Sequence, residues 1–432
     1  MATPPTRARF VLALWLCGLS AVLYLDRICM SQAVQPIQDE LGLSNSEMSY
    51  VLMAFTLAYG IFEIPTGRWG DVAGGRAVLT RIAVWWSAFT ALTGAGTGVV
   101  SLVLIRFLFG AGEAGAYPNV ARVLSRWMPA AERGRVQGVL LFSAQLGAVA
   151  APTWAAYLID GIGWRWTFVF FGALGVAWAV GFFLWFRDDP ADHPGVNAAE
   201  LAVIRAGTGV SAEAVREPVP WRAVLANPGI WLLGLCTTCA AFNTYFYFSW
   251  FPKYLMDARG VPNKEAGWLA SLALAGSAVG VLAGGWVADR LTRLGPARVW
   301  GRRMFCAGAF WAAGGCLFAA ARCESPTAMA ALAAASTLCL LLTLPTWWSA
   351  AIEQSGRHVG TLFGLMNSLG VVGAMSSQWF AGAFSDWRAA QGFTGREQWD
   401  PMFDVYVGVL LIGAAAWGTL TFHPLPDSRP SE

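Results

Sequence analysis

The chain consists of long apolar runs separated by short polar segments, with one longer polar break. A run of about 20 apolar residues is long enough to cross a bilayer as a helix. Twelve such spans are predicted, at 10–30, 48–66, 77–97, 100–122, 136–158, 166–186, 229–250, 265–287, 303–321, 327–350, 358–383 and 403–422. The pattern predicts an all-α membrane protein with six-helix domains at 1–186 and 229–432, joined by a cytoplasmic linker at 187–228.

The composition agrees with a membrane protein that has several spans. The 432 residues are 56% hydrophobic and only 13% charged, whereas soluble domains carry about 25% charged residues. No basic stripe interleaved with aromatic residues is present, so nucleic acid is not an expected partner.

Enzyme and metal motifs are also missing from the sequence. It contains three histidines, none well inside a span, and neither a Ser–His–Asp set nor a phosphate-binding loop. Cys236 and Cys239 form a Cys-x-x-Cys pair, but without a second pair or a nearby histidine they are interpreted as small packing residues. We therefore expect no enzyme activity, no metal and no cofactor.

The positive charges predict how the chain is oriented. Most of the 29 Lys and Arg residues fall on one side if both termini are cytoplasmic. Cytoplasmic loops of membrane proteins carry an excess of these residues. We expect a multi-pass protein of the inner membrane with both termini in the cytoplasm.

The two halves of the chain share sequence patterns. Gly67-Arg68-Trp69-Gly70-Asp71 follows the second span, and Gly285-Trp286-Val287-Ala288-Asp289-Arg290 follows the eighth. A second echo relates Gly134, Gly138 and Gln145 to Gly356, Gly360 and Asn367 at a constant offset of 222 residues. Two echoes at nearly one spacing predict duplicated, pseudo-symmetric six-helix bundles, a plan known from transporters.

The fourth span carries two opposite charges in its interior, Arg106 and Glu113. Seven residues are close to two helical turns, so both side chains share a face about 10 Å apart along the axis. Ionisable groups at membrane depth usually face a protein interior or a water-filled cavity. Either these residues belong to a polar pathway, or they form a structural pair that joins two helices.

These motifs resemble those of the major facilitator superfamily, whose signature is a Gly-x-x-x-Asp-(Arg) loop after spans two and eight. The second copy matches, and the first has Val72 where the family usually has Arg. Within it, the chain resembles the anion:cation symporter branch, which includes galactonate, glucarate and hexuronate transporters. The matching segments are Tyr24-Leu25-Asp26-Arg27, Tyr59 with Ile64-Pro65, Arg106 to Pro118, Glu132-Arg133-Gly134 and Gly364-Leu365-Met366-Asn367.

The resemblance implies proton-coupled uptake of an organic anion, with coupling carboxylates in spans one and four. Asp26 and Glu113 are then the proton carriers. Burial favours a protonated carboxyl group and a nearby arginine favours its ionised form, so the arrival of an anion can switch protonation. Arg27 is assigned to the substrate carboxylate because a guanidinium matches it with two parallel donors. Arg106 either binds the anion or positions the two acids, and we favour a coupling role.

Further residues are assigned to substrate binding and to gating. The predicted substrate contacts are Arg27, Tyr24, Tyr59, Gln145, Thr346, Trp347 and Asn367. Core packing is the alternative for the two tyrosines, and hydrogen bonding between helices is the alternative for Gln145 and Asn367. The predicted gating residues, at the ends of spans two and eight, are Asp71, Arg76, Asp289 and Arg290.

We therefore expect a proton symporter that imports a sugar acid by alternating access, acting as a monomer in the lipid bilayer. The hexonates, hexuronates and aldarates are the sugar acids considered. The alternative is an exchanger or exporter of another carboxylate, aromatic acids included, with the same fold. The expected partners are a small organic anion and protons, with the proton as coupling ion.

Overall fold

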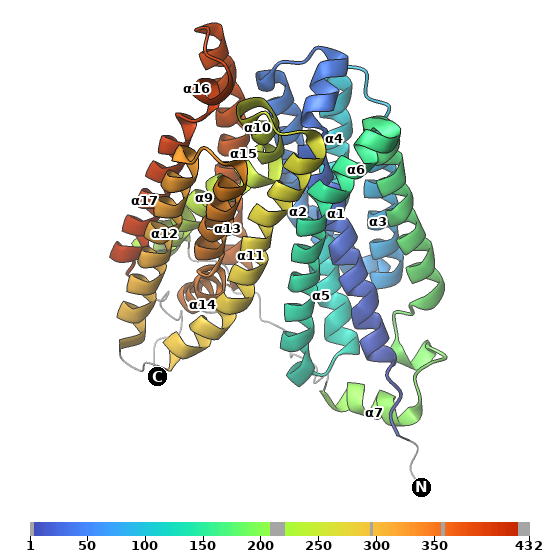
Figure 1. The fold of residues 1–432 in the computed structure, drawn as a ribbon. Coiled ribbons are helices and arrows are strands. Elements are labelled where there is room, and N and C mark those ends of the chain that lie inside the picture. Colours follow the sequence, from blue (N-terminus) through green and yellow to red (C-terminus); the bar gives the residue numbers. More distant parts are fainter. Residues whose placement is uncertain (1–3, 208–220, 294–296, 356–358, 422–432) are drawn as a thin grey trace. The chain divides into compact units, whose positions relative to one another are not determined.

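The computed structural model describes residues 4–207, 221–293, 297–355 and 359–421, and within these ranges all regular elements are helices (Figure 1). The chain forms two compact units. Unit 1 contains Met1–Leu43 and Tyr50–Val215, and unit 2 contains Ser44–Ser49 and Arg216–Glu432. The first part of the predicted linker thus belongs to unit 1.

Unit 1 is built from long helices that pack side by side. Its helices are α1 (Ala8–Leu41), α2 (Asn45–Ala73, which starts in unit 2), α3 (Gly75–Thr93), α4 (Val99–Glu113), α5 (Ala116–Trp127), α6 (Ala130–Trp185), the short 3-10 helix η1 (Pro190–Asp192) and α7 (Ala198–Gly207). Helix α6 packs against α1 and α3, and α3 also packs against α4. Gly163, with φ +78°, bends α6 between the predicted spans 136–158 and 166–186.

Unit 2 repeats this packing pattern. Its helices are α8 (Trp221–Ala226), α9 (Pro228–Ser249), α10 (Phe251–Arg259), α11 (Asn263–Thr292), α12 (Arg298–Arg322), α13 (Pro326–Leu341), α14 (Leu344–Ser355), α15 (Val359–Ala390), α16 (Gly395–Trp399) and α17 (Met402–Thr419). Helix α9 packs along α15, and α12 packs against both α17 and α13. These pairs correspond to α1 with α6 and to α3 with α6 and α4, as expected of a duplicated bundle.

Each of the twelve predicted spans overlaps helical segments along most of its length, and some run a few residues past a helix end, as 77–97 does beyond Thr93. Among the described residues, seven helical segments are long and apolar enough to cross a membrane, at Ala8–Leu41, Val99–Trp127, Ala130–Trp185, Asn263–Thr292, Arg298–Arg322, Pro326–Ser355 and Gly395–Thr419. Ala130–Trp185 holds two predicted spans. The remaining four lie in α2, α3, α9 and α15.

The predicted span 100–122 lies in the candidate span Val99–Trp127, but it is built from two helices. Helix α4 ends at Glu113, Gly115 adopts φ +99°, and α5 begins at Ala116. Glycine tolerates positive φ, and Pro118 near the start of α5 has no N–H to donate into a continuous helix. The predicted span 327–350 is also interrupted, without a residue of positive φ, between α13 and α14, where Pro345 is the second residue of α14.

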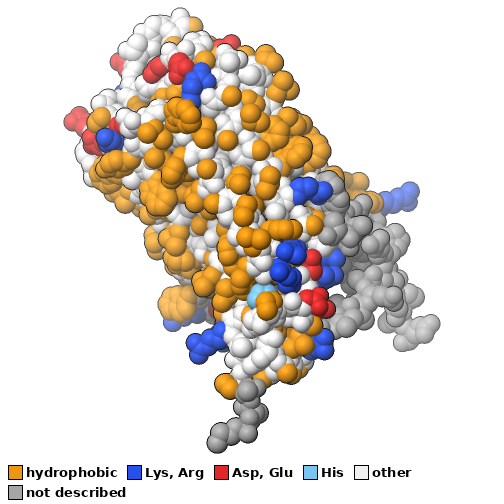
Figure 2. Space-filling model, turned by 90° about the vertical axis from the view of Figure 1, so that its right-hand side faces the viewer, with side chains coloured by type: hydrophobic (Ala, Val, Ile, Leu, Met, Phe, Trp, Pro, Cys, Tyr) orange, Lys and Arg blue, Asp and Glu red, His pale blue; other side chains and the backbone are white. Residues whose placement is uncertain are grey.

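The surface matches a chain surrounded by lipid. Large apolar side chains are widely exposed, among them Leu14, Val100 and Trp166, and hydrophobic side chains cover much of the face in Figure 2. Soluble monomers rarely expose apolar patches of such extent. The exposed apolar surface therefore supports a membrane setting.

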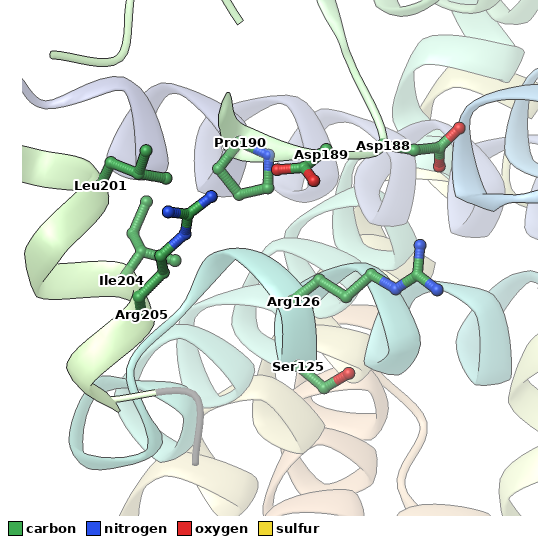
Figure 3. A pocket seen from close by; sticks show the side chains of 8 residues that line it. All are labelled: Ser125, Arg126, Asp188, Asp189, Pro190, Leu201, Ile204 and Arg205. Atoms are coloured by element: carbon green, nitrogen blue, oxygen red, sulfur yellow. The ribbon is translucent and has the colours of Figure 1, made fainter. Parts of the chain in front are cut away.

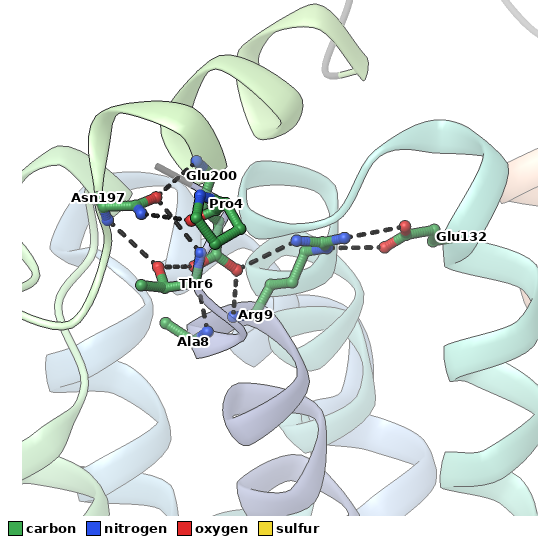
Figure 4. A network of polar contacts seen from close by, with 7 residues as sticks. All are labelled: Pro4, Thr6, Ala8, Arg9, Glu132, Asn197 and Glu200. Atoms are coloured by element: carbon green, nitrogen blue, oxygen red, sulfur yellow. Dashed lines mark hydrogen bonds and ion pairs between the residues drawn. The ribbon is translucent and has the colours of Figure 1, made fainter. Parts of the chain in front are cut away.

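The beginning of the linker is clamped to the start of α1 (Figure 4). The Glu200 carboxylate accepts from the Ala8 and Arg9 backbone N–H groups at 3.2 Å each, and from the Thr6 hydroxyl. The first N–H groups of a helix have no partner within it, and a carboxylate there also meets the positive end of the helix dipole. Glu200 therefore caps α1 from the linker.

Arg9 extends the clamp to α6. Its guanidinium lies 3.2 Å from Glu200 and donates twice to Glu132, at 2.9 and 3.2 Å. Asn197 caps α7 by accepting from the Glu200 N–H at 2.9 Å, and it donates to the Pro4 carbonyl at 2.8 Å. Three segments that are far apart in sequence are thus joined by one partly buried network.

Replacing Glu200 with alanine should destabilise unit 1. The side chain is fully buried, and its loss leaves one charge contact of Arg9 and two helix N–H groups unsatisfied. Removing one partner of a buried ion pair costs about 3 kcal/mol. We expect a lower thermal midpoint and faster tryptic cleavage near Arg205. Glu324→Ala, which removes an exposed carboxylate, is the control, and an equal midpoint in both variants would contradict the clamp.

The docked linker also encloses a pocket of about 450 Å³. Figure 3 shows its lining, which comes from the end of α5, the turn at 188–190 and one face of α7. The lining residues are Ser125, Arg126, Asp188, Asp189, Pro190, Leu201, Ile204 and Arg205. Asp188 is held there by the backbone N–H of Arg76 at 3.0 Å.

His193 anchors the same turn between two tryptophans. Its ring centroid lies 5.4 Å from that of Trp127 and 4.5 Å from that of Trp185. Its Nδ1 accepts from the Gly195 N–H at 3.0 Å, which requires an unprotonated nitrogen. Burial of the imidazole, and then the positive charge of Arg187, lower the pKa of His193 below its ordinary value.

Mild acid should therefore loosen this turn. Above the ordinary histidine pKa of about 6.5, His193 is neutral in both the folded and the unfolded chain. Below it, the unfolded chain binds the proton first, so stability falls as the pH falls towards the lowered native pKa. We expect the thermal midpoint to drop more between about pH 7.5 and pH 5.5 in the wild type than in His193→Gln. Equal drops would contradict this role.

Candidate functional site

Arg27 and Glu113 form a buried ion pair inside unit 1. The Nε of Arg27 lies 3.0 Å from Oε1 of Glu113, and its Nη2 contacts the same oxygen. The Glu113 side chain is fully buried and that of Arg27 is 10% exposed. Glu113 is the last residue of α4, so the break at Gly115 follows directly after this carboxylate. The Oε2 atom of Glu113 has no hydrogen-bond partner among the described residues.

Aromatic rings surround the Arg27 guanidinium. Its Cζ lies 5.0 Å from the ring centroid of Tyr24, 4.8 Å from that of Tyr59 and 5.0 Å from that of Phe55. A guanidinium over an aromatic face is attracted by the ring quadrupole, and more strongly where water is excluded. Tyr24 and Tyr59, both predicted substrate contacts, therefore lie beside the arginine assigned to the substrate.

Asp26 points to a different helix from its neighbour Arg27. Its Oδ2 accepts from Trp86 Nε1 at 3.1 Å and from the Thr90 hydroxyl at 3.4 Å, both on α3. The residue is fully buried, and its Oδ1 has no partner among the residues described. Adjacent helical residues differ by about 100° in direction, which explains why one reaches α3 and the other α4.

Arg106 is buried, and two of its guanidinium nitrogens donate no hydrogen bond to the described residues. It is 2% exposed, and within the described structure its Nε and Nη1 have no partner. Its Cζ lies 4.2 Å from the ring centroid of Phe109 and 5.2 Å from that of Phe55. Buried donors are usually paired in proteins. A buried guanidinium with two nitrogens that lack a partner among the described residues is therefore a candidate anion-binding group.

These four charged side chains sum to zero when all are ionised. Asp26 and Glu113 supply two negative charges, and Arg27 and Arg106 supply two positive charges. Three of them, all except Arg27, are at most 2% exposed. The free oxygens of the acids and the free nitrogens of Arg106 leave this buried cluster able to take up both a proton and an anion. We call these four residues the charge cluster.

Sequence reasoning missed the neutral residues around the charge cluster. Phe55, Trp86 and Thr90 contact its members from α2 and α3. None carries a charge or belongs to a motif, so no signal in the sequence alone marks them. Only the packing of α1 against its neighbours brings them together.

Other predicted site residues of unit 1 lie outside the cluster. Gln145 is half-buried on α6. Arg76 donates through its guanidinium to the Phe183 carbonyl and through its backbone N–H to Asp188, so in this structure it holds the start of the linker. Asp71 lies outside the residues whose side chains are described.

In unit 2 the predicted residues are neutral or exposed. Thr346 is fully buried, and Trp347 donates to the Leu233 carbonyl at 3.0 Å. Asn367 is half-buried on α15. Asp289 and Arg290 are exposed, and the Arg290 guanidinium stacks on Trp286 with its Cζ 3.4 Å from the ring centroid. Their functional roles remain predictions.

Metal-binding residues do not gather in the described structure. Within its residues, no group of three or more His, Cys, Asp or Glu side chains could hold a metal ion. Cys236 and Cys239 are buried free thiols, which fits their interpretation as packing residues.

The sequence matches a family model and several named proteins. The model of the Major Facilitator Superfamily matches residues 16–378. A probable sulfoacetate transporter of Cupriavidus necator is 31% identical over 96% of this chain and 95% of its own length. A probable L-galactonate transporter of Escherichia coli is 33% identical over 69% of this chain and 67% of its own length. A probable galactarate/D-glucarate transporter of Bacillus subtilis is 34% identical, covering 69% of each chain.

Solved structures share the fold. A bacterial homologue of the human lysosomal transporter Spinster, in an inward-facing and unoccupied conformation, gives a TM-score of 0.78 at 21% identity and covers 95% of this chain and 96% of its own. The D-xylose–proton symporter gives 0.71 at 13% identity, covering 96% and 98%. The family and these relatives are transporters, not enzymes. The predicted fold class is confirmed, and the chain belongs to the Major Facilitator Superfamily.

Proposed function

We propose that this transporter imports an organic anion of the sugar-acid class together with protons. The main support for this proposal is the charge balance of the buried charge cluster. Asp26, Glu113, Arg27 and Arg106 sum to zero when ionised, so an incoming anion would leave a net negative charge in a desolvated site. Uncompensated charge there is strongly unfavourable. Protonation of one carboxyl group restores neutrality, and this links anion binding to proton binding.

The geometry supports different roles for Arg27 and Arg106. Glu113 holds Arg27 in an ion pair, whereas Nε and Nη1 of Arg106 have no hydrogen-bond partner among the described residues. A proton on Glu113 would remove its charge and release Arg27 to the substrate carboxylate. Asp26, which also has a free oxygen, is the second proposed proton carrier. Arg106 keeps its proposed coupling role because it balances both acids.

The relatives support a small anion as the cargo. They include a probable L-galactonate transporter, a probable galactarate/D-glucarate transporter and a probable sulfoacetate transporter. The proposed hydroxyl and carboxylate contacts remain Tyr24, Tyr59, Gln145 and Arg27 in unit 1, with Thr346, Trp347 and Asn367 in unit 2. The proposed gating residues remain Asp71, Arg76, Asp289 and Arg290. We place the protein in the inner membrane as a monomer with both termini in the cytoplasm.

A second candidate is exchange or export of another carboxylate, including aromatic acids. The observation that favours it is the set of rings around Arg27, formed by Tyr24, Phe55 and Tyr59. Aromatic walls suit a planar aromatic acid through stacking.

A substrate panel in proteoliposomes tests the cargo class. The labelled probes are D-galactonate, D-glucarate, sulfoacetate and 4-hydroxyphenylacetate, with glucose as the uncharged control. We expect uptake of a sugar acid and none of glucose. Uptake of 4-hydroxyphenylacetate alone would favour the second candidate, and uptake of glucose would overturn the assignment of an anion site.

A further inference from the structure

The ring of Phe55 contacts both arginines of the charge cluster. Its centroid lies 5.0 Å from Cζ of Arg27 and 5.2 Å from Cζ of Arg106. Phe55 is 4% exposed and lies on α2. One neutral side chain thus contacts the arginine that is paired with Glu113 and the arginine that has free donors.

Close packing of α2 against α4 fixes this ring. A Cβ atom added to Gly110 would collide with the Phe55 carbonyl oxygen, so the two helices approach as closely as glycine permits. The Phe55 ring centroid lies 5.4 Å from that of Phe109 and 6.0 Å from that of Tyr59. Gly110 lies one helical turn after Arg106. The close contact at Gly110 therefore holds the Phe55 ring level with the Arg106 guanidinium.

The ring faces stabilise Arg106 without using its donors. A carboxylate partner would occupy the N–H groups, whereas an aromatic face attracts the cation and leaves in-plane N–H groups open. Phe55 and Phe109 are the two rings against Arg106, and its Nε and Nη1 have no partner within the described residues. This arrangement keeps a charged guanidinium ready for an anion at a buried site.

We propose that Phe55 is a positioning residue for anion binding. It holds Arg106 charged, with donors open to an anion, and the same ring contacts Arg27. The inference rests on the proposed function. It adds a specific role for the π electrons of Phe55, a residue that carries no charge and belongs to no sequence motif.

Fluorination of the ring tests this role with almost no change in shape. Phenylalanine carrying one, two or three fluorines is incorporated at position 55, because each fluorine weakens the negative face of the ring. The matched control is the same series at Phe182, whose ring stacks on Trp178 and Phe186 at 4.7 Å. Uptake of labelled D-galactonate and sulfoacetate is measured for each protein, together with yield and thermal midpoint.

We expect the KM for the transported probe to rise stepwise at position 55, by about tenfold with three fluorines, with little change in maximal rate. The Phe182 series should keep the wild-type KM. Phe55→Leu should show the same loss, with rescue by Phe55→Trp. A flat KM across the Phe55 series, or equal changes at Phe182, would overturn the inference while leaving the proposed function intact. A wild-type protein that transports neither these probes nor other anions would overturn both.

Discussion

Proteoliposomes containing Glu113→Gln should lose proton-driven accumulation of the anion while still exchanging it across the membrane. Glutamine keeps the size of the side chain but cannot carry a proton. It also leaves Arg27 without the carboxylate that holds it, so the anion can bind without a proton entering. The expected effect is the loss of essentially all accumulation above equilibrium, measured with an inside-alkaline pH gradient and with preloaded vesicles for exchange.

Glu40→Gln is the matched control for this experiment. Glu40 also pairs with an arginine, Arg165, at 2.9 Å, but its side chain is 48% exposed and lies near the opposite end of α1 from the N-terminus. Surface ion pairs contribute little, so this variant should accumulate the anion normally. Normal accumulation by Glu113→Gln as well would exclude Glu113 as a proton carrier.

Arg106→Lys should weaken anion binding by about 100-fold, or about 3 kcal/mol. The ammonium group keeps the positive charge but cannot offer two parallel donors in one plane, and it is more strongly hydrated than a guanidinium. The nitrogens that lack a partner among the described residues, Nε and Nη1, are removed by this substitution. A rise in KM is the expected readout.

The matched control is Arg302→Lys in unit 2. Arg302 is as deeply buried, at 1% exposure, but it pairs with Glu353 at 2.9 Å. Its replacement should lower stability or yield and leave the KM of the folded protein unchanged. A KM that rises equally in both variants would mean that Arg106 acts through the general integrity of the fold.

Much of the architecture could be predicted because the bilayer restricts the chain so strongly. Apolar runs of the right length must form helices when no water can satisfy the backbone, and all twelve predicted spans overlap helical segments along most of their length. The repeated motifs at Asp71 and Asp289 indicated a duplication. The corresponding helix pairs within unit 1 and within unit 2 support it. The break at Gly115 was missed because hydrophobicity does not report a single positive φ angle.

The site could be predicted only in part. The charged members of the cluster stand out because charge is rare and costly in a membrane helix, and the spacing of Arg106 and Glu113 placed them on one face. The spacing did not indicate that Glu113 pairs with Arg27 on α1. Partners on other helices, such as Trp86 for Asp26 and Phe55 for both arginines, depend on tertiary packing. No periodic pattern in the sequence reveals these contacts.

The most direct test of proton coupling is uptake driven by a pH gradient alone. Purified wild-type protein in proteoliposomes is given labelled D-galactonate and sulfoacetate, with the inside alkaline, and with or without a protonophore. The predicted result is transient accumulation of one probe above its outside concentration, which collapses when the protonophore is added. Uptake that only equilibrates, with the same rate in the presence and absence of the gradient, would contradict proton symport.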